Sequence, residues 1–176
     1  GEAGGRGLAL RAAKILTVAR KAPAVVDHGV LLVKDGKIEA VGKARDLAIP
    51  EGYDVVDLGD QWLMPGLIEL HNHVGNGYGF FVNDINDTVL LTNPGLRASP
   101  GVRPDNALLR RGVAGWVTTA LYIPGSGSNM GGAGVLFKLG MPTYEEMLVR
   151  DPGSLKLAQA GNPEGFTVGV TRTFMN

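Results

Sequence analysis

The sequence predicts an α/β fold with an accessory β module, and three observations support this. Short apolar segments follow one another closely from residue 8 to residue 64 and leave no room for helices between them. Pro65-Gly66 then interrupts the chain. From Leu67 onward, strand-like and helix-like segments alternate, which is the pattern of parallel β/α units. We therefore expect a small antiparallel or mixed sheet in residues 1–64 and a β/α part in residues 65–176.

The clearest signal in the first part is a β-hairpin. A first strand is expected over residues 8–18. Asp35-Gly36 suits the positive φ angles of a tight turn, and apolar runs at 30–33 and 38–41 flank it. Two more short strands are expected, at 54–58 and 62–64. Strands this close together predict a sheet that forms a module of its own.

The second part begins with a strand expected over residues 67–74. A helix is expected over 104–111, because Pro104 suits an early helical position and Gly112 suits a C-terminal stop. The following segment, 115–123, is rich in Val, Thr, Trp and Tyr and predicts a second strand.

A second, shorter helix is expected near the end of the chain. Thr143 and Glu146 have the Ser/Thr-x-x-Glu spacing of a capping box, and the helix is expected to end near Arg150. Residues 154–160 then predict a third strand of the β/α part.

Two of the three histidines, His71 and His73, stand two residues apart at the end of the first strand of the β/α part. Since successive strand residues point to opposite faces, both imidazoles face one side and Asn72 points away. Neutral imidazole is a preferred ligand for zinc and similar ions. The spacing favours a metal site, while half-exposed strand residues beside a turn would give the same pattern.

The second strand leads into a Gly-rich run at residues 124–132. This run is not a nucleotide-binding fingerprint, because Gly125 and Gly127 are followed by Met130 instead of a third glycine. Two interpretations stay open: a tightly turned connector, or a loop that contacts a substrate carboxylate or carbonyl. The candidate substrate-binding side chains of the loop are Ser126, Ser128 and Asn129.

The run from Pro65 to His73 resembles the first-strand signature of the amidohydrolase superfamily, Pro-Gly-x-Ile-Asp-x-His-x-His, with Glu69 where Asp is usual. Further segments resemble the imidazolonepropionase-related branch, and together they span most of the chain as an N-terminal portion of such a protein. These segments are Gly112-Val113, 117–119, 124–132, 155–158 and Asn162-Pro163.

The resemblance implies that residues 1–64 are part of a composite β-sandwich and that residues 65–176 are the N-terminal part of a (β/α)8 barrel. Such a TIM barrel needs eight strands and typically about 250 residues. Only about three barrel strands are expected here, and an open parallel sheet would expose its edges and apolar faces. We therefore expect a complementary chain, from a nicked precursor or a separate gene, that completes the barrel and the sandwich, and a higher oligomer.

The resemblance also implies a metal-dependent amidohydrolase that is active only in complex with that chain. It would hydrolyse a C–N bond of a cyclic amide, amide or amidine-type small molecule by a metal-bound hydroxide. His71 and His73 would hold one or two ions of zinc or another divalent transition metal, and the general base is expected on the complementary chain. Glu69 and Lys156 are candidates for supporting the site from behind the ligands.

One departure from the resembled pattern concerns the metal site. Relatives often read Gly-Glu-Asn-Pro where this chain has Ala160-Gly161-Asn162-Pro163, so a carboxylate is absent. Two alternatives to catalysis therefore stay open. The chain could be a non-catalytic assembly or binding subunit with a lost or altered metal site, or a structural piece whose histidines only pack.

Composition excludes several other classes of function. Lys plus Arg and Asp plus Glu both number 17, which gives no net attraction to nucleic acid. Cysteine is absent, which excludes disulfides and thiolate metal sites. No apolar run approaches the roughly 18 to 20 residues of a membrane span, so we expect a soluble chain. The start at Gly1 fits removal of a leader, and cytoplasmic and exported locations both stay open.

Overall fold

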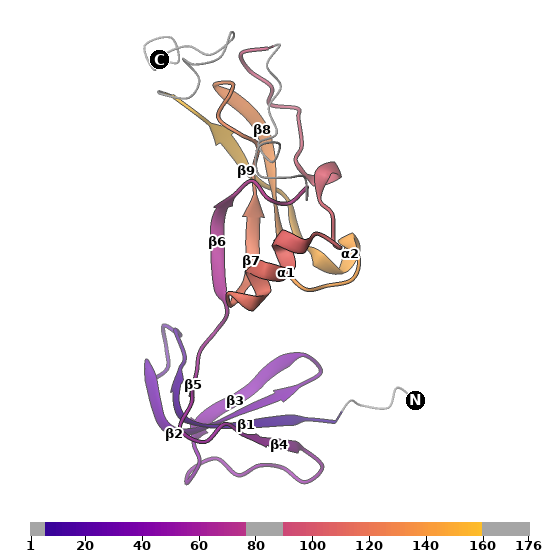
Figure 1. Cartoon of the computed structure of the whole chain (residues 1–176). Coiled ribbons are helices and arrows are strands. Elements are labelled where there is room, and N and C mark those ends of the chain that lie inside the picture. Colours follow the sequence, from indigo (N-terminus) through magenta and orange to yellow (C-terminus); the bar gives the residue numbers. More distant parts are fainter. Residues whose placement is uncertain (1–5, 77–89, 160–176) are drawn as a thin grey trace. The chain divides into compact units, whose positions relative to one another are not determined.

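A five-stranded sheet and a four-stranded sheet form the two units of the chain, Gly1–Pro65 and Gly66–Asn176 (Figure 1). The computed structural model describes residues 6–76 and 90–159. Within this described part, no helix is long and apolar enough to cross a lipid bilayer.

The first unit is a mixed sheet with strand order β3-β2-β1-β4, in which β5 also pairs with β1. The β1–β2 and β2–β3 pairs are antiparallel, whereas β4 and β5 run parallel to β1. The expected antiparallel or mixed sheet is therefore confirmed. The five strands are β1 (Leu8–Leu16), β2 (Val25–Lys34), β3 (Lys37–Lys43), β4 (Asp54–Asp57) and β5 (Trp62–Leu63).

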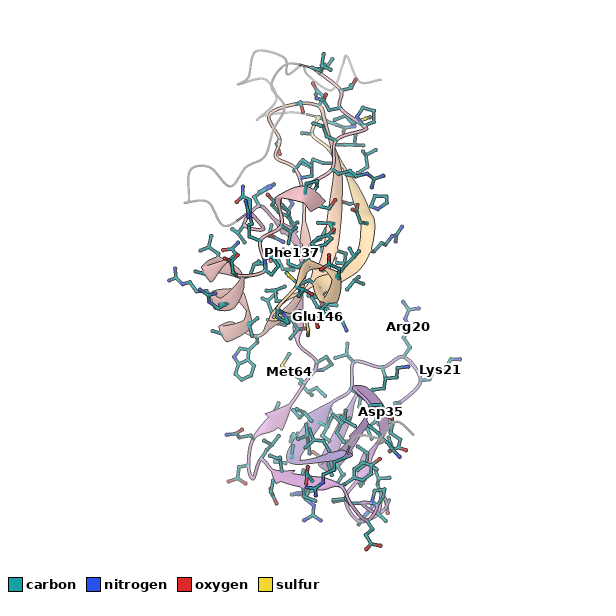
Figure 2. The ribbon with its side chains drawn as sticks, turned by 90° about the vertical axis from the view of Figure 1, so that its right-hand side faces the viewer. Arg20, Lys21, Asp35, Met64, Phe137 and Glu146 are labelled. Atoms are coloured by element: carbon teal, nitrogen blue, oxygen red, sulfur yellow. The ribbon has the colours of Figure 1, made fainter. Side chains whose placement is uncertain are left out.

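The expected hairpin joins β2 to β3. Asp35 and Gly36 have φ angles of 49° and 71°, the pair of positive values that a type I′ turn requires. Asp35 is labelled in Figure 2.

Near this unit's surface, a hydrogen bond from the Tyr53 hydroxyl to the Glu39 carboxylate raises the pKa of Tyr53 above its ordinary value of 10.0.

The second unit has strand order β6-β7-β8-β9. Only β6 and β7 are parallel, and β7–β8 and β8–β9 are antiparallel. Its elements are β6 (Leu67–Asn72), the 3-10 helix Ser99–Gly101, α1 (Ala107–Ala114), β7 (Val117–Tyr122), β8 (Met130–Lys138), α2 (Tyr144–Met147) and β9 (Leu148–Leu157). The predicted parallel β/α organisation is therefore confirmed for β6–α1–β7. It is wrong for the segments after β7.

The third parallel strand expected at 154–160 is replaced by β9, an antiparallel partner of β8 that begins at Leu148. The Gly-rich run is also only partly a connector, because β8 starts inside it at Met130. Gly132 has a φ of 103°, and a Cβ there would lie 2.6 Å from the Leu96 carbonyl oxygen. Glycine therefore lets another backbone segment approach the strand closely.

Local capping explains where the helices begin. Helix α1 starts at Ala107, three residues later than expected, because the Asn106 side chain accepts a 2.8 Å hydrogen bond from the Leu108 amide. The helix ends at Ala114, with Gly115 as its C-cap, instead of stopping at Gly112 as expected. In α2, the Thr143 hydroxyl accepts from the Glu146 amide at 3.3 Å, which confirms Thr143 as the N-cap of this helix. The Thr143 hydroxyl also lies 3.2 Å from the Glu146 carboxylate.

The core of the second unit lies between the sheet and the segments that cover it. Its fully buried members include Tyr122 from β7, Val135 and Phe137 from β8, and Met147 from α2. Figure 2 labels Phe137 within this unit. This core fixes β7 and β8, and β7 in turn fixes the end of β6 at which the candidate site lies.

Candidate metal centre at the end of β6

Asn72 joins the end of β6 to β7. Its side-chain amide donates to the Leu121 carbonyl at 2.8 Å, and its side-chain oxygen accepts from the Val74 amide at 3.2 Å. The Ile123 amide also donates to the Asn72 carbonyl at 3.1 Å. Three hydrogen bonds therefore hold the residue between the two histidines, and they limit the positions that the histidine backbones can take.

The two imidazoles lie next to each other. Their ring centroids are 5.1 Å apart, and the ring planes make an angle of 88°. His71 is exposed, whereas His73 is half-buried. The Nδ1 atom of His73 lies 3.0 Å from the Ile123 carbonyl oxygen, across the gap between β6 and β7.

This geometry fits a divalent ion such as zinc. Two imidazoles bound to one tetrahedral ion, at Zn–N distances of about 2.0–2.1 Å, hold their ring centroids roughly 5 Å apart. The Ile123 carbonyl can only accept a hydrogen bond, so we assign the His73 proton to Nδ1. Nε2 then carries the lone pair, which is the arrangement usual in metal-binding histidines. Edge-to-face packing of aromatic rings also gives centroid distances of about 4.5–7 Å.

Glu69 lies on the same strand and contacts the backbone of the first histidine. Its side-chain oxygen Oε1 accepts a 2.7 Å hydrogen bond from the His71 amide. The side chain is exposed, so this contact is made at the open edge of the sheet. Glu69 therefore orients the His71 backbone, which is a supporting position.

The three candidate substrate-binding residues have different surroundings. Asn129 is fully buried, and its side-chain amide donates to the Ala158 carbonyl at 2.9 Å, which anchors the chain just after β9. Ser128 is also fully buried, and its hydroxyl has no hydrogen-bond partner among the described residues. Ser126 is only half-buried. Of the three, Asn129 makes a contact that serves the fold.

Lys156 is buried in β9, with 8% of its surface exposed. A Cβ on Gly131 would lie 3.4 Å from the Lys156 Cγ atom and 3.2 Å from the Pro124 Cβ atom. The stem of this lysine therefore packs against the run that directly follows Ile123, the residue that contacts His73. The fold thus brings Lys156 to the end of the sheet that carries the histidines.

No cluster of three or more His, Cys, Asp or Glu side chains that could hold a metal occurs within residues 6–76 and 90–159. The segment Ala160–Pro163, where the relatives' carboxylate is missing, lies outside these residues. The described residues therefore contribute two imidazoles to the candidate centre.

Several contacts around the site could not be predicted from the sequence. His73 meets a carbonyl 50 residues away, and Asn72 meets one 49 residues away. Neither distant residue contributes a polar side chain, so no motif marks them. The strand–helix–strand pattern of residues 67–123 was the one available signal, because parallel strands joined in this way have their C-terminal ends side by side.

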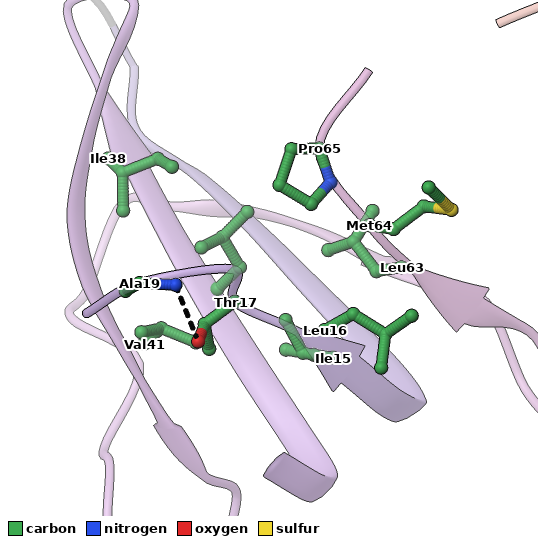
Figure 3. A pocket seen from close by; sticks show the side chains of 10 residues that line it. Ile15, Leu16, Thr17, Ala19, Ile38, Val41, Leu63, Met64 and Pro65 are labelled. Carbon is green, nitrogen blue, oxygen red and sulfur yellow. Dashed lines mark hydrogen bonds between the residues drawn. The ribbon is translucent and has the colours of Figure 1, made fainter. Parts of the chain in front are cut away.

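The first unit has a cavity of about 240 Å3 whose lining is almost wholly apolar (Figure 3). The Thr17 hydroxyl accepts from the Ala19 amide at 3.3 Å and donates to the Pro23 carbonyl at 2.8 Å. The lining therefore offers packing surface and no reactive group. It consists of Ile15, Leu16, Thr17, Ala19, Leu31, Ile38, Val41, Leu63, Met64 and Pro65.

The fold defines the class of protein to which this chain is related. A crystal structure of an amidohydrolase from Thermotoga maritima MSB8 matches 89% of this chain with a TM-score of 0.76 and 30% sequence identity. The match covers 40% of that structure's own chain. The sheet-rich fold of the two units is therefore that of an amidohydrolase over the part that both chains share.

Curated relatives narrow the comparison. An imidazolonepropionase of Methylobacterium sp. (strain 4-46) is 35% identical over 69 residues, which are 38% of this chain and 17% of that relative. A 5-methylthioadenosine/S-adenosylhomocysteine deaminase of Shouchella clausii is 35% identical over 68 residues, or 38% of this chain and 15% of the relative. No protein-family model matches the chain.

The resemblance seen in the sequence is thereby confirmed: the chain is homologous to amidohydrolases, and its homologues include imidazolonepropionases. The matched regions span less than a fifth of both curated relatives, so this chain corresponds to a part of them. That partial coverage agrees with the expected N-terminal portion.

Proposed function

We propose that this chain carries part of the active site of a metal-dependent hydrolase that cleaves C–N bonds. The observation that supports it most directly is the pair of imidazoles with a centroid separation of 5.1 Å. The contact of His73 Nδ1 with the Ile123 carbonyl adds to it, since it leaves Nε2 as the nitrogen that can bind an ion. Homology to amidohydrolases gives the reaction class.

In this proposal each described residue has a separate role. His71 and His73 hold the ion and do not act as acid or base. Asn72 and the Ile123 carbonyl fix the position of the pair, and Glu69 orients the His71 backbone. A divalent ion of zinc or another transition metal, when bound there, would supply the Lewis acidity for activating water and polarising a carbonyl or imine carbon.

The substrate class follows from the relatives. The proteins named imidazolonepropionase and 5-methylthioadenosine/S-adenosylhomocysteine deaminase point to nitrogen-containing small molecules. For this chain we propose a cyclic amide, an amide or an amidine-type compound. Ser126, Ser128 and Asn129 stay the candidate contacts to it, and the buried Ser128 hydroxyl makes no hydrogen bond to any described residue.

Further protein completes the site in this proposal. β6 is the outermost strand of its sheet among the described residues, and Leu67, Ile68 and Leu70 are 48%, 62% and 62% exposed. Apolar side chains on an unpaired edge favour cover by another strand. The apolar cavity of the first unit likewise favours cover by further protein (Figure 3). We propose that a complementary segment supplies the remaining barrel strands, the rest of the sandwich and the general base.

Metal analysis of the intact protein tests the proposal. We expect the His71→Ala/His73→Ala variant to lose its divalent ion, measured by elemental mass spectrometry, together with hydrolysis of cyclic amides. Loss of activity should be at least about 100-fold, because the metal step is removed as a whole. His28→Asn is the matched control, since His28 lies in the first unit with a φ of 48° that asparagine tolerates.

The alternatives give different results in the same experiment. A protein that binds the ion through both histidines but hydrolyses none of these compounds would be a binding or assembly subunit. A double variant that keeps its metal and its activity would refute the ligand role and leave the two rings as a packed pair.

A further inference from the structure

A second cavity of about 390 Å3 lies over β8 in the second unit, and none of its lining residues belongs to the candidate metal centre. Its walls come from the segment before the 3-10 helix and from β9, which lie on the two sides of β8. The lining residues are Pro94, Gly95, Arg97, Ala133, Arg150, Pro152, Gly153, Ser154 and Leu155.

The arrangement of the three backbone segments explains the hollow. Arg97 pairs with Ala133 of β8, and Ala133 pairs with Leu155 of β9. Residues paired in this way place their side chains on one face of a sheet. Ala133, at the centre of this row, has only a methyl group, so space remains between the longer side chains of Arg97 and Leu155.

An irregularity in β9 gives the second wall its shape. Gly134 pairs with Ser154 and Leu136 pairs with Arg150, so Val135 alone lies opposite the three residues 151–153. Extra residues of this kind bend a strand and redirect its side chains. The bend brings Arg150 into the lining of the cavity together with Gly153.

The charge in the cavity is positive. Arg97 donates from one of its terminal nitrogens to the Asp151 carboxylate at 3.0 Å, which fixes its guanidinium across β8. A guanidinium has five N–H donors, so this single bond occupies a minority of them. Arg150 forms no ion pair with any described residue, and no carboxylate is part of the lining.

We propose that this cavity binds the anionic group, a carboxylate or a phosphate, of a small molecule. Two arginines in the lining of one cavity suit the paired oxygen atoms of either group, because the planar forked donors of a guanidinium match them. One arginine is held in place by Asp151, and the other brings the positive charge that a bound anion neutralises. A Cβ at Gly95 would meet nothing within 4 Å, so the cavity has room for a ligand beside this backbone segment.

Binding of simple anions to the intact protein tests the proposal. Titration calorimetry with inorganic phosphate and, separately, with succinate should give saturable binding to one site, weakened by added salt. We expect Arg150→Gln to lower the affinity about tenfold or more, because a charge-assisted hydrogen bond is removed. Tighter binding of phosphate would assign a phosphorylated ligand, and tighter binding of succinate a carboxylate ligand.

Gly95 offers a matched pair of variants that does not depend on removing an arginine. A Cβ at Gly95 meets nothing within 4 Å, so a side chain can be added there without a clash. Gly95→Asp places a carboxylate at the cavity and should abolish anion binding, whereas the nearly isosteric Gly95→Asn should retain it. Arg111→Gln, an exposed arginine of α1 outside the cavity, controls for the change in net charge.

The proposal is overturned if neither anion shows saturable binding. It is also overturned if binding is the same in the parent protein, in Arg150→Gln and in Gly95→Asp. Circular dichroism of each variant distinguishes a lost site from a lost fold.

Discussion

The strands β6 and β8 belong to one sheet, yet their surroundings differ. β8 lies between β7 and β9, and five consecutive residues from Gly131 to Val135 are buried. β6 pairs with β7 alone among the described residues, and its apolar side chains are about half exposed or more. The histidine pair lies at the end of the strand with the fewer partners. The candidate metal centre is therefore built at the margin of the described fold, and its support comes from β7.

The largest expected contrast is in the energetics of the two strands. Phe137 of β8 is fully buried, so Phe137→Ala should lower the free energy of unfolding by about 3–5 kcal/mol. Leu70 of β6 is 62% exposed, and its described contacts account for less than about 1 kcal/mol. Because we propose that further protein covers β6, we expect Leu70→Ala to cost about 2 kcal/mol or more in the intact protein.

Chemical denaturation of both variants measures the contrast. A cost below about 1 kcal/mol for Leu70→Ala in the intact protein would argue against a covering strand on β6. A similarly small cost for Phe137→Ala would contradict the core position of β8.

An intermediate effect is expected at Asn72, which joins β6 to β7. Asn72→Ala removes the bonds to the Leu121 carbonyl and from the Val74 amide, and it should lower stability by about 1–3 kcal/mol. Metal affinity should fall by about tenfold or more, because the histidine backbones lose their anchor. Asn72→Asp keeps the acceptor for Val74 and removes the donor to Leu121, so it separates the two bonds. Unchanged metal affinity in both variants would show that Asn72 serves stability alone.

The smallest effect is expected at Glu69, on the exposed edge of β6. In Glu69→Gln the side-chain oxygen can still accept from the His71 amide, and stability should change by less than about 0.5 kcal/mol. Metal affinity should change by less than about tenfold, compared with loss of the ion in the histidine variants. Equilibrium dialysis against zinc measures the metal affinity of this variant and of the histidine variants. A loss as large as that of His71→Ala would give Glu69 a direct part in binding the ion.

Local sequence signals predicted the parts of the fold that depend on neighbouring residues. The Asp35-Gly36 turn, the N-cap at Thr143 and the neighbouring ends of β6 and β7 are such parts. The antiparallel β8–β9 pair was missed because its glycines read as a loop, although Gly132 is a strand residue that accommodates Leu96. Close approach of a distant backbone leaves no local pattern, and the same reason hid the arginine cavity.

The candidate site was predicted to a similar extent. Strand alternation predicted that His71 and His73 would share a face, and the two rings do lie together. The contact that sets the His73 proton was not predictable, since the Ile123 carbonyl is a backbone group 50 residues away. Whether the pair binds an ion stays a prediction that metal analysis will test.

The contact between His73 and the Ile123 carbonyl links the tautomer of a side chain to the alignment of two strands. If β7 were shifted by one residue, the backbone carbonyl next to His73 would point away from the imidazole. The histidine could then carry its proton on either nitrogen, and its readiness to bind an ion would fall. If the histidine pair binds zinc as we propose, the zinc affinity would therefore report whether β6 and β7 have paired correctly during folding.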